Sequence, residues 1–426
     1  MAKKPTKDKE GKEDDKKDGI LKYEVDNSAE SKEQGELDRV REFNLLGDIG
    51  SQLLMAAREV CGFSDVMSSS ATGNIEDYEY CDTGIPALNM LISGSFKKGL
   101  PPRICGLSGI SQSGKTYIGL RAAARAQKKG VLIIFFDSEG SVTRQTMEKH
   151  GIDVSKVIFI PVHRVNAFGA AATLMLDKLE VANFVQCPIT KKLRRKPRGQ
   201  YQRVMFIVDS LGMMSNKSDA ASIVNDTNTV GQKAKDIRAV FRELSNRMAI
   251  HGICMLFTNH VSESMPKPGQ SSAPQIISGG GKGPEYSATV LILFKSRALR
   301  EDQEKSTSDI VGTQITAKCL KNRMVPPLTE IVIDLNFEEG VDEYSGLFEL
   351  GVEAGLIKQN GSWYSFNDTK VLGKAGIMAL GADKIFTPEF MDKLDAWVQK
   401  EFSYNSDAIS KEVEVEDVVI ENEVKG

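Results

Sequence analysis

The chain has few of the residues that build disulfide frameworks or metal clusters. Its 426 residues include only six cysteines and four histidines, and no C-x-x-C pair or His/Cys cluster occurs. This scarcity disfavours both a disulfide framework and a zinc site. Three cysteines fall inside apolar, strand-like runs, and we expect them to be reduced core residues: Cys105, Cys254 and Cys319.

Long apolar runs and an excess of positive charge are also missing. No stretch of roughly eighteen apolar residues exists, and the first residues lack the apolar segment of a secretory signal. Lys and Arg number 55 against 58 Asp and Glu, giving a net charge of −3. A polyanionic partner would therefore be bound by local basic groups or by a repeated assembly. We expect a cytoplasmic protein without membrane contact.

The two ends of the chain are predicted to be tails. Residues 1–36 are mostly Lys, Asp, Glu, Ser and Gly, which predicts a disordered charged segment. In residues 37–75, apolar positions interrupted by Gly47 and Gly50 predict a small helical segment. Residues 406–426 alternate Val and Ile with Glu, and predict an acidic, solvated tail.

Residues 76–335 alternate between short apolar runs and amphipathic stretches such as 117–129 and 230–247. The apolar runs occupy 103–107, 131–136, 157–162, 204–208, 253–257 and 289–294. This alternation predicts an α/β fold with a mainly parallel central sheet flanked by helices on both faces.

Two further runs, 314–320 and 330–335, predict a hairpin-like pair near the sheet edge. After about residue 336 the pattern changes to Gly-rich turns and short helices. A small α/β C-terminal domain is therefore expected over residues 336–405.

A glycine-rich segment between an expected strand and an expected helix fits the phosphate-binding pattern G-x-x-x-x-G-K-[ST]. Glycines let the loop amides point at phosphate oxygens, the lysine ammonium reaches the β- and γ-phosphates, and the threonine hydroxyl ligates Mg²⁺. An ordinary Gly/Ser turn is the alternative, and the strand and helix on either side disfavour it. The residues expected to hold the nucleotide are Gly109, Ser111, Gln112, Ser113, Gly114, Lys115, Thr116 and Tyr117.

Acidic residues end two of the expected strands. Asp209 follows the run 204–208, at the edge where ligands bind in α/β sheets, and is expected to hold the metal through water. Asp137 and Glu139 follow the run 131–136 and, two apart on a strand, would share a face. Glu139 is thus a candidate to deprotonate the attacking water. A helix N-cap around Asp137-Ser138 is the alternative.

In this order, these residues resemble those of RecA-type recombinases, and most of all the UvsX-like recombinases of bacteriophages. The resemblance runs from about Thr83 to about Glu401, and includes Phe136-Asp-Ser-Glu139, Thr258-Asn-His260 and Leu320-Lys-Asn-Arg323. It implies a RecA-type P-loop ATPase core that uses ATP and Mg²⁺, with Lys115, Glu139 and His260 as its catalytic residues. His260 would act as the sensor of the γ-phosphate.

The resemblance also implies contacts between neighbouring subunits of a helical homo-oligomeric filament. Lys321 and Arg323 match basic residues that reach ATP bound on the adjacent subunit, as arginine fingers do. A surface-exposed basic pair is the alternative. Tyr286 matches an interface aromatic, with plain core packing as the alternative.

Two segments match the mobile DNA-binding loops of the family, about 213–229 and about 261–281. Between them the amphipathic stretch 230–247 carries a basic stripe that would bind phosphates, or else forms an ordinary solvated helix face. The residues expected to contact DNA are Lys235, Arg238, Arg242, Lys267, Gly280, Gly281 and Lys282. Candidates to wedge between bases are Met213, Met214, Met265 and Ile276.

The sequence departs from the family at two places. The segment after Glu139 lacks the aromatic on which the family stacks adenine, which leaves Arg144 or Met147 as candidates to cover the base. Residues 190–199 carry six positive charges and no acid where most relatives have a short turn. This segment is either a solvated loop or a contact for incoming duplex DNA.

The predicted function is that of an ATP-dependent recombinase, which forms filaments on single-stranded DNA and pairs that strand with homologous double-stranded DNA. A loader protein and a single-stranded-DNA-binding protein are expected partners, in the host cytoplasm if the gene is a phage's. The alternatives are a hexameric replicative helicase built on the same core and a nucleotide-gated DNA-binding scaffold.

Overall fold

The computed structural model describes most of residues 80–402. The described ranges are 24–25, 80–186, 188–189, 193–196, 202–215, 232–264, 275–278, 283–300, 309–326, 330–367 and 369–402. The remainder of the predicted tails, the helical segment over 37–75, Lys267 and the run Gly280–Lys282 lie outside them. Glu24–Val25 form strand β1, so the prediction of a disordered tail over 1–36 is wrong at these two residues. Within these ranges, no helix is both long enough and apolar enough to cross a bilayer.

The chain divides into two units. The larger one comprises residues 72–176 and 202–426, and the smaller one comprises residues 1–71 and 177–201.

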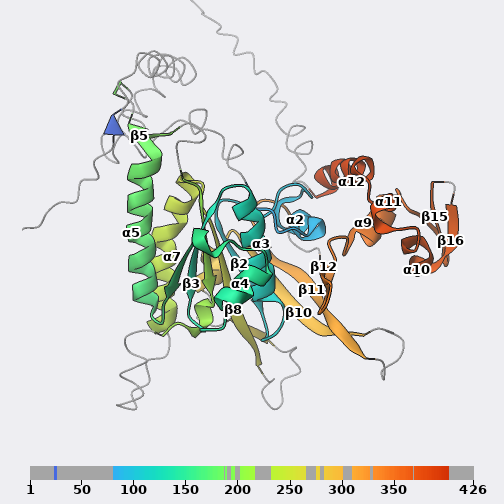
Figure 1. Cartoon of the computed structure of the whole chain (residues 1–426), viewed down its shortest axis with the longest axis horizontal. Coiled ribbons are helices and arrows are strands. Elements are labelled where there is room, and N and C mark those ends of the chain that lie inside the picture. The colour runs from blue at the N-terminus through green and yellow to red at the C-terminus, as the bar shows by residue number, and fades with distance from the viewer. Residues whose placement is uncertain are drawn as a thin grey trace, which may run out of the picture. The chain divides into compact units, whose positions relative to one another are not determined.

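The larger unit contains a ten-stranded sheet with the order β13-β12-β11-β10-β2-β8-β7-β3-β4, to which β9 adds beside β8 (Figure 1). Neighbouring strands from β10 to β4 run parallel, whereas β10, β11, β12 and β13 are antiparallel in turn. The strands are β2 (Ile104–Gly109), β3 (Leu132–Asp137), β4 (Val157–Pro161), β7 (Val204–Asp209), β8 (Cys254–Ser264), β9 (Gln275–Ser278), β10 (Val290–Arg300), β11 (Ile310–Asn322), β12 (Glu330–Asn336) and β13 (Gly340–Val341). The predicted mainly parallel α/β sheet is confirmed, as is the antiparallel pair formed by β11 and β12.

Helices cover both faces of this sheet because its central strands are apolar on both sides. Every residue of β2 and β7 is buried. On one face Ile133, Phe135 and Ile207 belong to the same core as the apolar side of α3 (Lys115–Lys128). On the other face Phe136 packs against Phe168 of α5 (Val165–Asn183), and Phe257 packs against Phe241 of α7 (Gln232–Ile250). Burial on both faces is what a parallel sheet requires.

The described cysteines are core residues. Cys81, Cys105, Cys254 and Cys319 are all free and buried, which confirms the expectation for the last three. A hydrogen bond with Cys254 and burial together raise the pKa of the Cys81 thiol well above its ordinary value. These thiols therefore pack as small apolar side chains.

The C-terminal residues form a small α/β segment, drawn in orange and red in Figure 1. It contains a three-stranded antiparallel sheet and four helices within the described residues, with a core that includes Phe386, Phe390 and Leu394. Its elements are α9 (Leu347–Glu353), β14 (Lys358–Asn360), β15 (Trp363–Phe366), β16 (Thr369–Leu372), α10 (Gly373–Met378), α11 (Ala382–Ile385) and α12 (Pro388–Glu401). The predicted small C-terminal α/β fold is therefore present.

The smaller unit contains a second three-stranded sheet. Strand β5 (Phe184–Gln186) pairs parallel with β1 (Glu24–Val25) and antiparallel with β6 (Leu193–Arg195). The alternative of a loop over 190–199 is therefore wrong for Leu193–Arg195, because these residues form a strand that pairs with β5.

The second DNA-loop segment also contains regular structure. Strand β8 continues to Ser264, and Val261–Ser264 pair antiparallel with β9. The prediction of a loop from Val261 onward is wrong at these positions, where β-branched residues such as Val261 favour a strand.

Candidate nucleotide-binding site

A cavity of about 680 Å³ lies at the carboxyl ends of the parallel strands. Sheet register brings the strand ends together there, because Gly109 pairs with His260 and Phe294, and Asp137 pairs with Asp209. The cavity is lined by Ile110, Ser111, Gln112, Ser113, Gly114, Lys115, Thr116, Tyr117, Glu139, Asp209, His260, Ser296, Arg297, Ala298, Thr313, Leu335 and Phe337. Most of the predicted nucleotide-binding residues therefore share one cavity.

The loop between β2 and α3 needs glycine at both glycine positions of its pattern, Gly109 and Gly114. A Cβ on Gly109 would come within 2.6 Å of the Phe294 carbonyl oxygen. Gly114 caps the N-terminus of α3 with a φ of 84°, in the left-handed region that side chains disfavour. The loop therefore ends at a helix N-terminus that faces the cavity, a favourable site for phosphate.

Lys115 extends its side chain back over this loop. It is buried, and its Nζ donates to the carbonyl oxygens of Gly109 (3.0 Å) and Ile110 (2.6 Å). Burial lowers the pKa of Lys115, and the nearby charges of Asp209 and Glu139 oppose that shift. The ammonium thus lies among the loop backbone groups that would surround a phosphate.

Asp209 ends β7 next to Thr116. Its Oδ2 accepts from the Thr116 hydroxyl at 2.7 Å, and its Oδ1 accepts from the Thr258 hydroxyl. Burial raises the pKa of Asp209, while these two hydrogen bonds lower it. A hydroxyl beside a carboxylate is an oxygen donor set that fits Mg²⁺, which also takes ligands from water and phosphate. The peptide bond between Asp209 and Ser210 is cis.

Glu139 and His260 form the second polar pair of the cavity. The His260 Nε2 lies 2.8 Å from the Glu139 Oε1. Strand β3 ends at Asp137, so the prediction that Glu139 continues the strand and shares the face of Asp137 is wrong.

The alternative helix cap at Asp137 is also wrong. Asp137 Oδ1 accepts from the amides of Glu139 (3.1 Å) and Gly140 (3.0 Å), which closes a turn. The next helix, α4 (Arg144–Lys149), starts later and is capped by Thr143. The turn, rather than a strand, directs Glu139 toward His260.

Lys321 and Arg323 lie at the opposite end of the sheet. Lys321 pairs with Leu291, which pairs with Gly106, three residues before Gly109 and about 10 Å away along the strand. Both cations donate to the Tyr286 carbonyl oxygen, at 2.7 Å and 3.1 Å. They do not line the cavity of their own chain. Tyr286 is 62% exposed, so the alternative of core packing is wrong for it.

The basic stripe of α7 is solvent-exposed in the structure. Lys235, Arg238 and Arg242 are exposed, whereas Ile237 and Phe241 are buried. The helix thus has one basic, exposed side and one apolar, buried side, as its sequence predicts. The contact of the basic side with DNA stays a prediction.

The candidates to wedge between DNA bases differ in their exposure to solvent. Met213 is 59% exposed, but Met214 is fully buried and is excluded as a wedge, because it packs into the protein. The side chains of Met265 and Ile276 lie outside the described residues.

Neither candidate for covering the base lies at the cavity. Met147 is buried in the core, and Arg144 pairs with Glu148 on the exposed side of α4. Sequence reasoning missed Phe337 and Arg297, which do line the cavity. They reach it because β10, β11 and β12 follow one another on one side of β2, and a local sequence pattern does not reveal this strand order. The only sequence signal was an aromatic residue in a polar turn after an expected strand.

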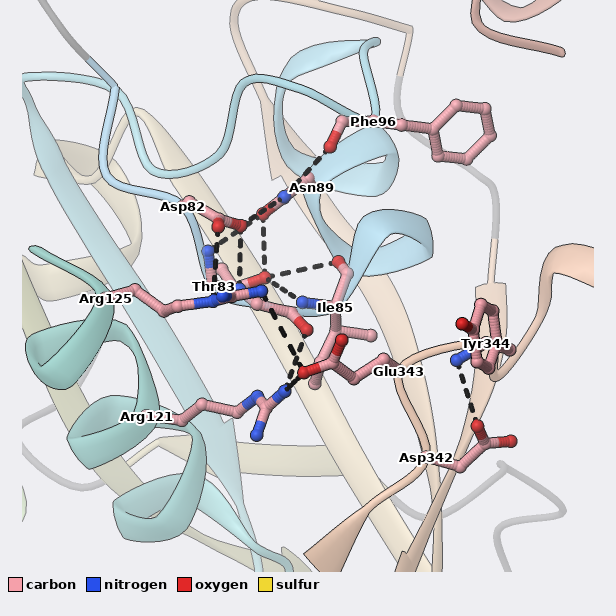
Figure 2. Close-up of polar contacts among 11 residues, drawn as sticks. Asp82, Thr83, Ile85, Asn89, Phe96, Arg121, Arg125, Asp342, Glu343 and Tyr344 are labelled. Atoms are coloured by element: carbon pink, nitrogen blue, oxygen red, sulfur yellow. Dashed lines mark hydrogen bonds and ion pairs between the residues drawn. The ribbon is translucent and has the colours of Figure 1, made fainter. Parts of the chain in front are cut away.

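A polar network fixes the outer side of α3 (Figure 2). Arg121 donates to the Gly84 carbonyl oxygen at 3.1 Å and forms an ion pair with Glu343, and the Arg125 Nε lies 3.3 Å from the Asp82 Oδ2. Arg121 and Arg125 are four residues apart, on one helix face. Helix α3, which begins with Lys115, is therefore tied to Asp82 and Gly84 before α2 (Pro86–Ser93) and to Glu343 before α9.

Fold and cavity together define an α/β protein of the P-loop nucleotide-binding class. The family model of the RecA N-terminal domain matches residues 56–175 and 202–342, more than half of the chain. The chain belongs to the RecA family and is a RecA-like recombinase.

Similar proteins come from a phage and from bacteria. The "Recombination and repair protein" of Enterobacteria phage T4 is 27% identical over 287 residues, which span 66% of this chain and 66% of the phage protein. "Protein RecA" of Bacteroides thetaiotaomicron is 26% identical over 299 residues, covering 70% of this chain and 81% of that protein. "Protein RecA" of Rhizobium leguminosarum bv. viciae is 25% identical over 311 residues, covering 73% and 79%.

Proposed function

We propose that this recombinase hydrolyses ATP with Mg²⁺, forms filaments on single-stranded DNA and exchanges that strand with homologous duplex DNA. One observation carries the proposal: Lys115, the Thr116–Asp209 pair and the Glu139–His260 pair line one cavity at a helix N-terminus. These are the parts needed to bind a triphosphate, hold a divalent cation and activate water.

Each of these residues has a role in the proposed reaction. Lys115 holds the β- and γ-phosphates, and Thr116 and Asp209 hold Mg²⁺, with Asp209 acting through water. Glu139 accepts a proton from the attacking water, and His260 contacts the γ-phosphate. Mg²⁺, when bound, would neutralise part of the negative charge that develops on the phosphates. Since His260 and Glu139 share a hydrogen bond, the presence of the γ-phosphate and the position of the base are linked.

In the proposed filament, a neighbouring protomer adds Lys321 and Arg323 to this cavity, which its own Lys321 and Arg323 do not line. Lys321 and Arg323 lie at the far end of the sheet beside the exposed Tyr286. A neighbouring protomer stacked along the filament would present them to the triphosphate as arginine fingers. This arrangement makes hydrolysis depend on assembly.

DNA is proposed to bind along α7 and the segments on either side of it. The exposed residues Lys235, Arg238 and Arg242 would contact phosphates. The side chains of Lys267 and Lys282 and the backbone amides of Gly280 and Gly281 would do so as well. Lys233 donates to the Gly212 carbonyl oxygen, three residues after Asp209, at 2.5 Å. This hydrogen bond gives a direct physical connection between the metal-binding strand end and α7.

The remaining parts of the proposal concern organisation and partners. The ATPase core is assigned to residues 76–335, the polymerisation segment to 37–75, the C-terminal domain to 336–405 and the tails to 1–36 and 406–426. A loader and a single-stranded-DNA-binding protein would act with the filament in the cytoplasm. A hexameric helicase would instead form closed rings, and a scaffold would show no DNA-stimulated turnover.

The test is to image the full-length protein with single-stranded DNA and a non-hydrolysable ATP analogue by electron microscopy. Helical filaments are expected, with single-stranded-DNA-stimulated ATPase and strand exchange in parallel assays with ATP. The variant Lys115→Ala should lose all three. A protein that stays monomeric and does not bind DNA at saturating analogue contradicts the proposal, and closed rings favour the helicase.

A further inference from the structure

A single serine hydroxyl joins the turn that carries Glu139 to the end of β7. The Ser138 hydroxyl donates to the Ser210 carbonyl oxygen at 2.6 Å and accepts from the Ser210 amide at 3.0 Å. The Ser138 amide donates to the Asp209 carbonyl oxygen at 2.8 Å. The residue directly before Glu139 is therefore bound to the strand end through both its backbone and its side chain.

The two contacts of the Ser138 hydroxyl have a defined direction. A carbonyl oxygen only accepts and an amide N–H only donates, so the hydroxyl proton points at the Ser210 carbonyl oxygen. Ser210 is fully buried. An alanine in place of Ser138 would keep the backbone of the turn but take the hydroxyl acceptor away from a buried amide, which is costly. The hydroxyl is thus a specific connection between two backbones.

The backbone on the far side of this connection is itself held in place. Five residues after Ser210, the amide and the hydroxyl of Ser215 both donate to the His163 carbonyl oxygen, at 2.8 Å and 2.9 Å. The Val165 amide at the start of α5 donates to the Ser215 carbonyl oxygen at 3.0 Å. Because the segment is fastened at both of its ends, Ser210 is a fixed point against which Ser138 is positioned.

Glu139 has little support on its other side. Gly140 follows it, and a Cβ there would meet no atom within 4 Å. The position of Glu139 therefore depends on Asp137, which accepts from the amides of Glu139 and Gly140, and on the contacts of Ser138. Asp137 is also a buried residue at the end of β3. The Ser138 hydroxyl is the contact that can be removed without changing the strand end.

We infer that Ser138 is a positioning residue for Glu139, because its hydroxyl fixes the backbone before Glu139 relative to the strand end at Asp209. This inference rests on the proposed function, in which Glu139 accepts the proton of the attacking water. A base has to lie within hydrogen-bond reach of that water, and a misplacement of about 1 Å can lower a rate about a hundredfold. Glu139 lines the cavity and Ser138 does not, so the loss of the hydroxyl affects turnover and not nucleotide binding.

The test separates turnover from binding in the full-length protein. Ser138→Ala should lower the kcat of single-stranded-DNA-stimulated ATP hydrolysis about ten- to a hundredfold. Its affinities for Mg-ATP, measured calorimetrically, and for a single-stranded oligonucleotide should match those of the parent, which also shows that the variant is folded. Ser138→Thr keeps the hydroxyl and should recover most of the turnover. The matched control, Ser155→Ala, removes an exposed hydroxyl that donates to Asp153, and should hydrolyse ATP as the parent does.

A double variant distinguishes positioning of Glu139 from any other effect on turnover. If Ser138 acts through Glu139, Ser138→Ala should lower kcat little further when it is added to Glu139→Gln. Parental kcat in Ser138→Ala, or effects of the two substitutions that multiply, would show that Ser138 does not position the base. The proposed function survives either result as long as Glu139→Gln alone is defective. Parental turnover in Glu139→Gln would instead overturn the base that the proposed function assigns.

Discussion

At the carboxyl ends of the parallel strands, carboxylates, hydroxyls and an ammonium contact one another around a cavity, whereas at the opposite end of the sheet two cations stand beside an exposed tyrosine. Thr116 and Asp209 share a hydrogen bond at the first end. At the second end, Lys321 and Arg323 both donate to the Tyr286 carbonyl oxygen. In the proposed function, this difference means that the first end receives the triphosphate and the second supplies positive charge to a triphosphate on a neighbouring protomer.

The largest expected effect comes from removing the cations at the far end. Lys321→Ala combined with Arg323→Ala should lower DNA-stimulated ATP turnover about a thousandfold, because finger-type cations stabilise the transition-state charge to that degree. Lys318→Ala, an exposed lysine on the same strand, is the matched control and should retain turnover.

Mixing variants sharpens this comparison. Protomers with Lys115→Ala have a defective cavity but intact cations, and the double variant has the reverse. A mixture of the two should recover measurable ATPase, because some interfaces then combine an intact cavity with intact cations. A mixture as inactive as its components would show that the two ends of the sheet do not meet between protomers.

A smaller effect is expected at the cavity end. Glu139→Gln should reduce turnover about a hundredfold, since the amide cannot accept the proton of the attacking water. Its ATP affinity, measured calorimetrically, should stay close to that of the parent. Glu148→Gln, on the exposed side of α4, is the control. Unchanged turnover in Glu139→Gln would remove Glu139 as the base.

Residues 190–199, in the smaller unit, provide a further test. Neutralising its six positive charges should reduce the slope of log affinity for duplex DNA against log salt by up to about five. Basal ATPase should not change, because no residue of the segment lines the cavity within the described part of the chain. The control neutralises Lys128, Lys129, Lys149 and Lys156. An equal slope before and after the change would leave the segment as a solvated insertion.

The smallest effect is expected where α3 meets the turn before α9. Glu343→Gln removes the partly exposed ion pair with Arg121, and should lower the free energy of unfolding by about 1 kcal/mol or less. Urea denaturation measures this change, with Glu349→Gln, another exposed ion-paired carboxylate, as the control. A loss of several kcal/mol would mean that the pair supports the whole helix.

Local patterns in the sequence predicted the central strands and the glycine-rich loop between β2 and α3. The runs 204–208 and 253–257 are apolar, and Asp209 and His260 follow them in the sequence. The place of both residues at one edge of the sheet therefore followed from parallel topology. The direction of Glu139 did not follow, because Asp137 closes a turn after the strand ends.

Residues brought together by strand order could not be predicted in the same way. Phe337 reaches the cavity through the register of β10, β11 and β12 beside β2, which no local pattern encodes. Met147 was a candidate for the base because it lies near Glu139 in sequence, yet the helix face it occupies turns it into the core. The pairing of Leu193–Arg195 with β5 is likewise non-local.

Asn89 of α2 (Pro86–Ser93) illustrates how much can depend on one amide. Its Oδ1 accepts from the amide (3.0 Å) and hydroxyl (2.7 Å) of Thr83, and its Nδ2 donates to Asp82 Oδ1 (2.7 Å) and the Phe96 carbonyl oxygen (3.0 Å) (Figure 2). Two donors and two acceptor sites are the full valence of a carboxamide. Aspartate has the same shape but no N–H donors, and leucine has a similar volume but neither donors nor acceptors. Among the twenty amino acids, only asparagine therefore makes all four hydrogen bonds with a side chain of this length.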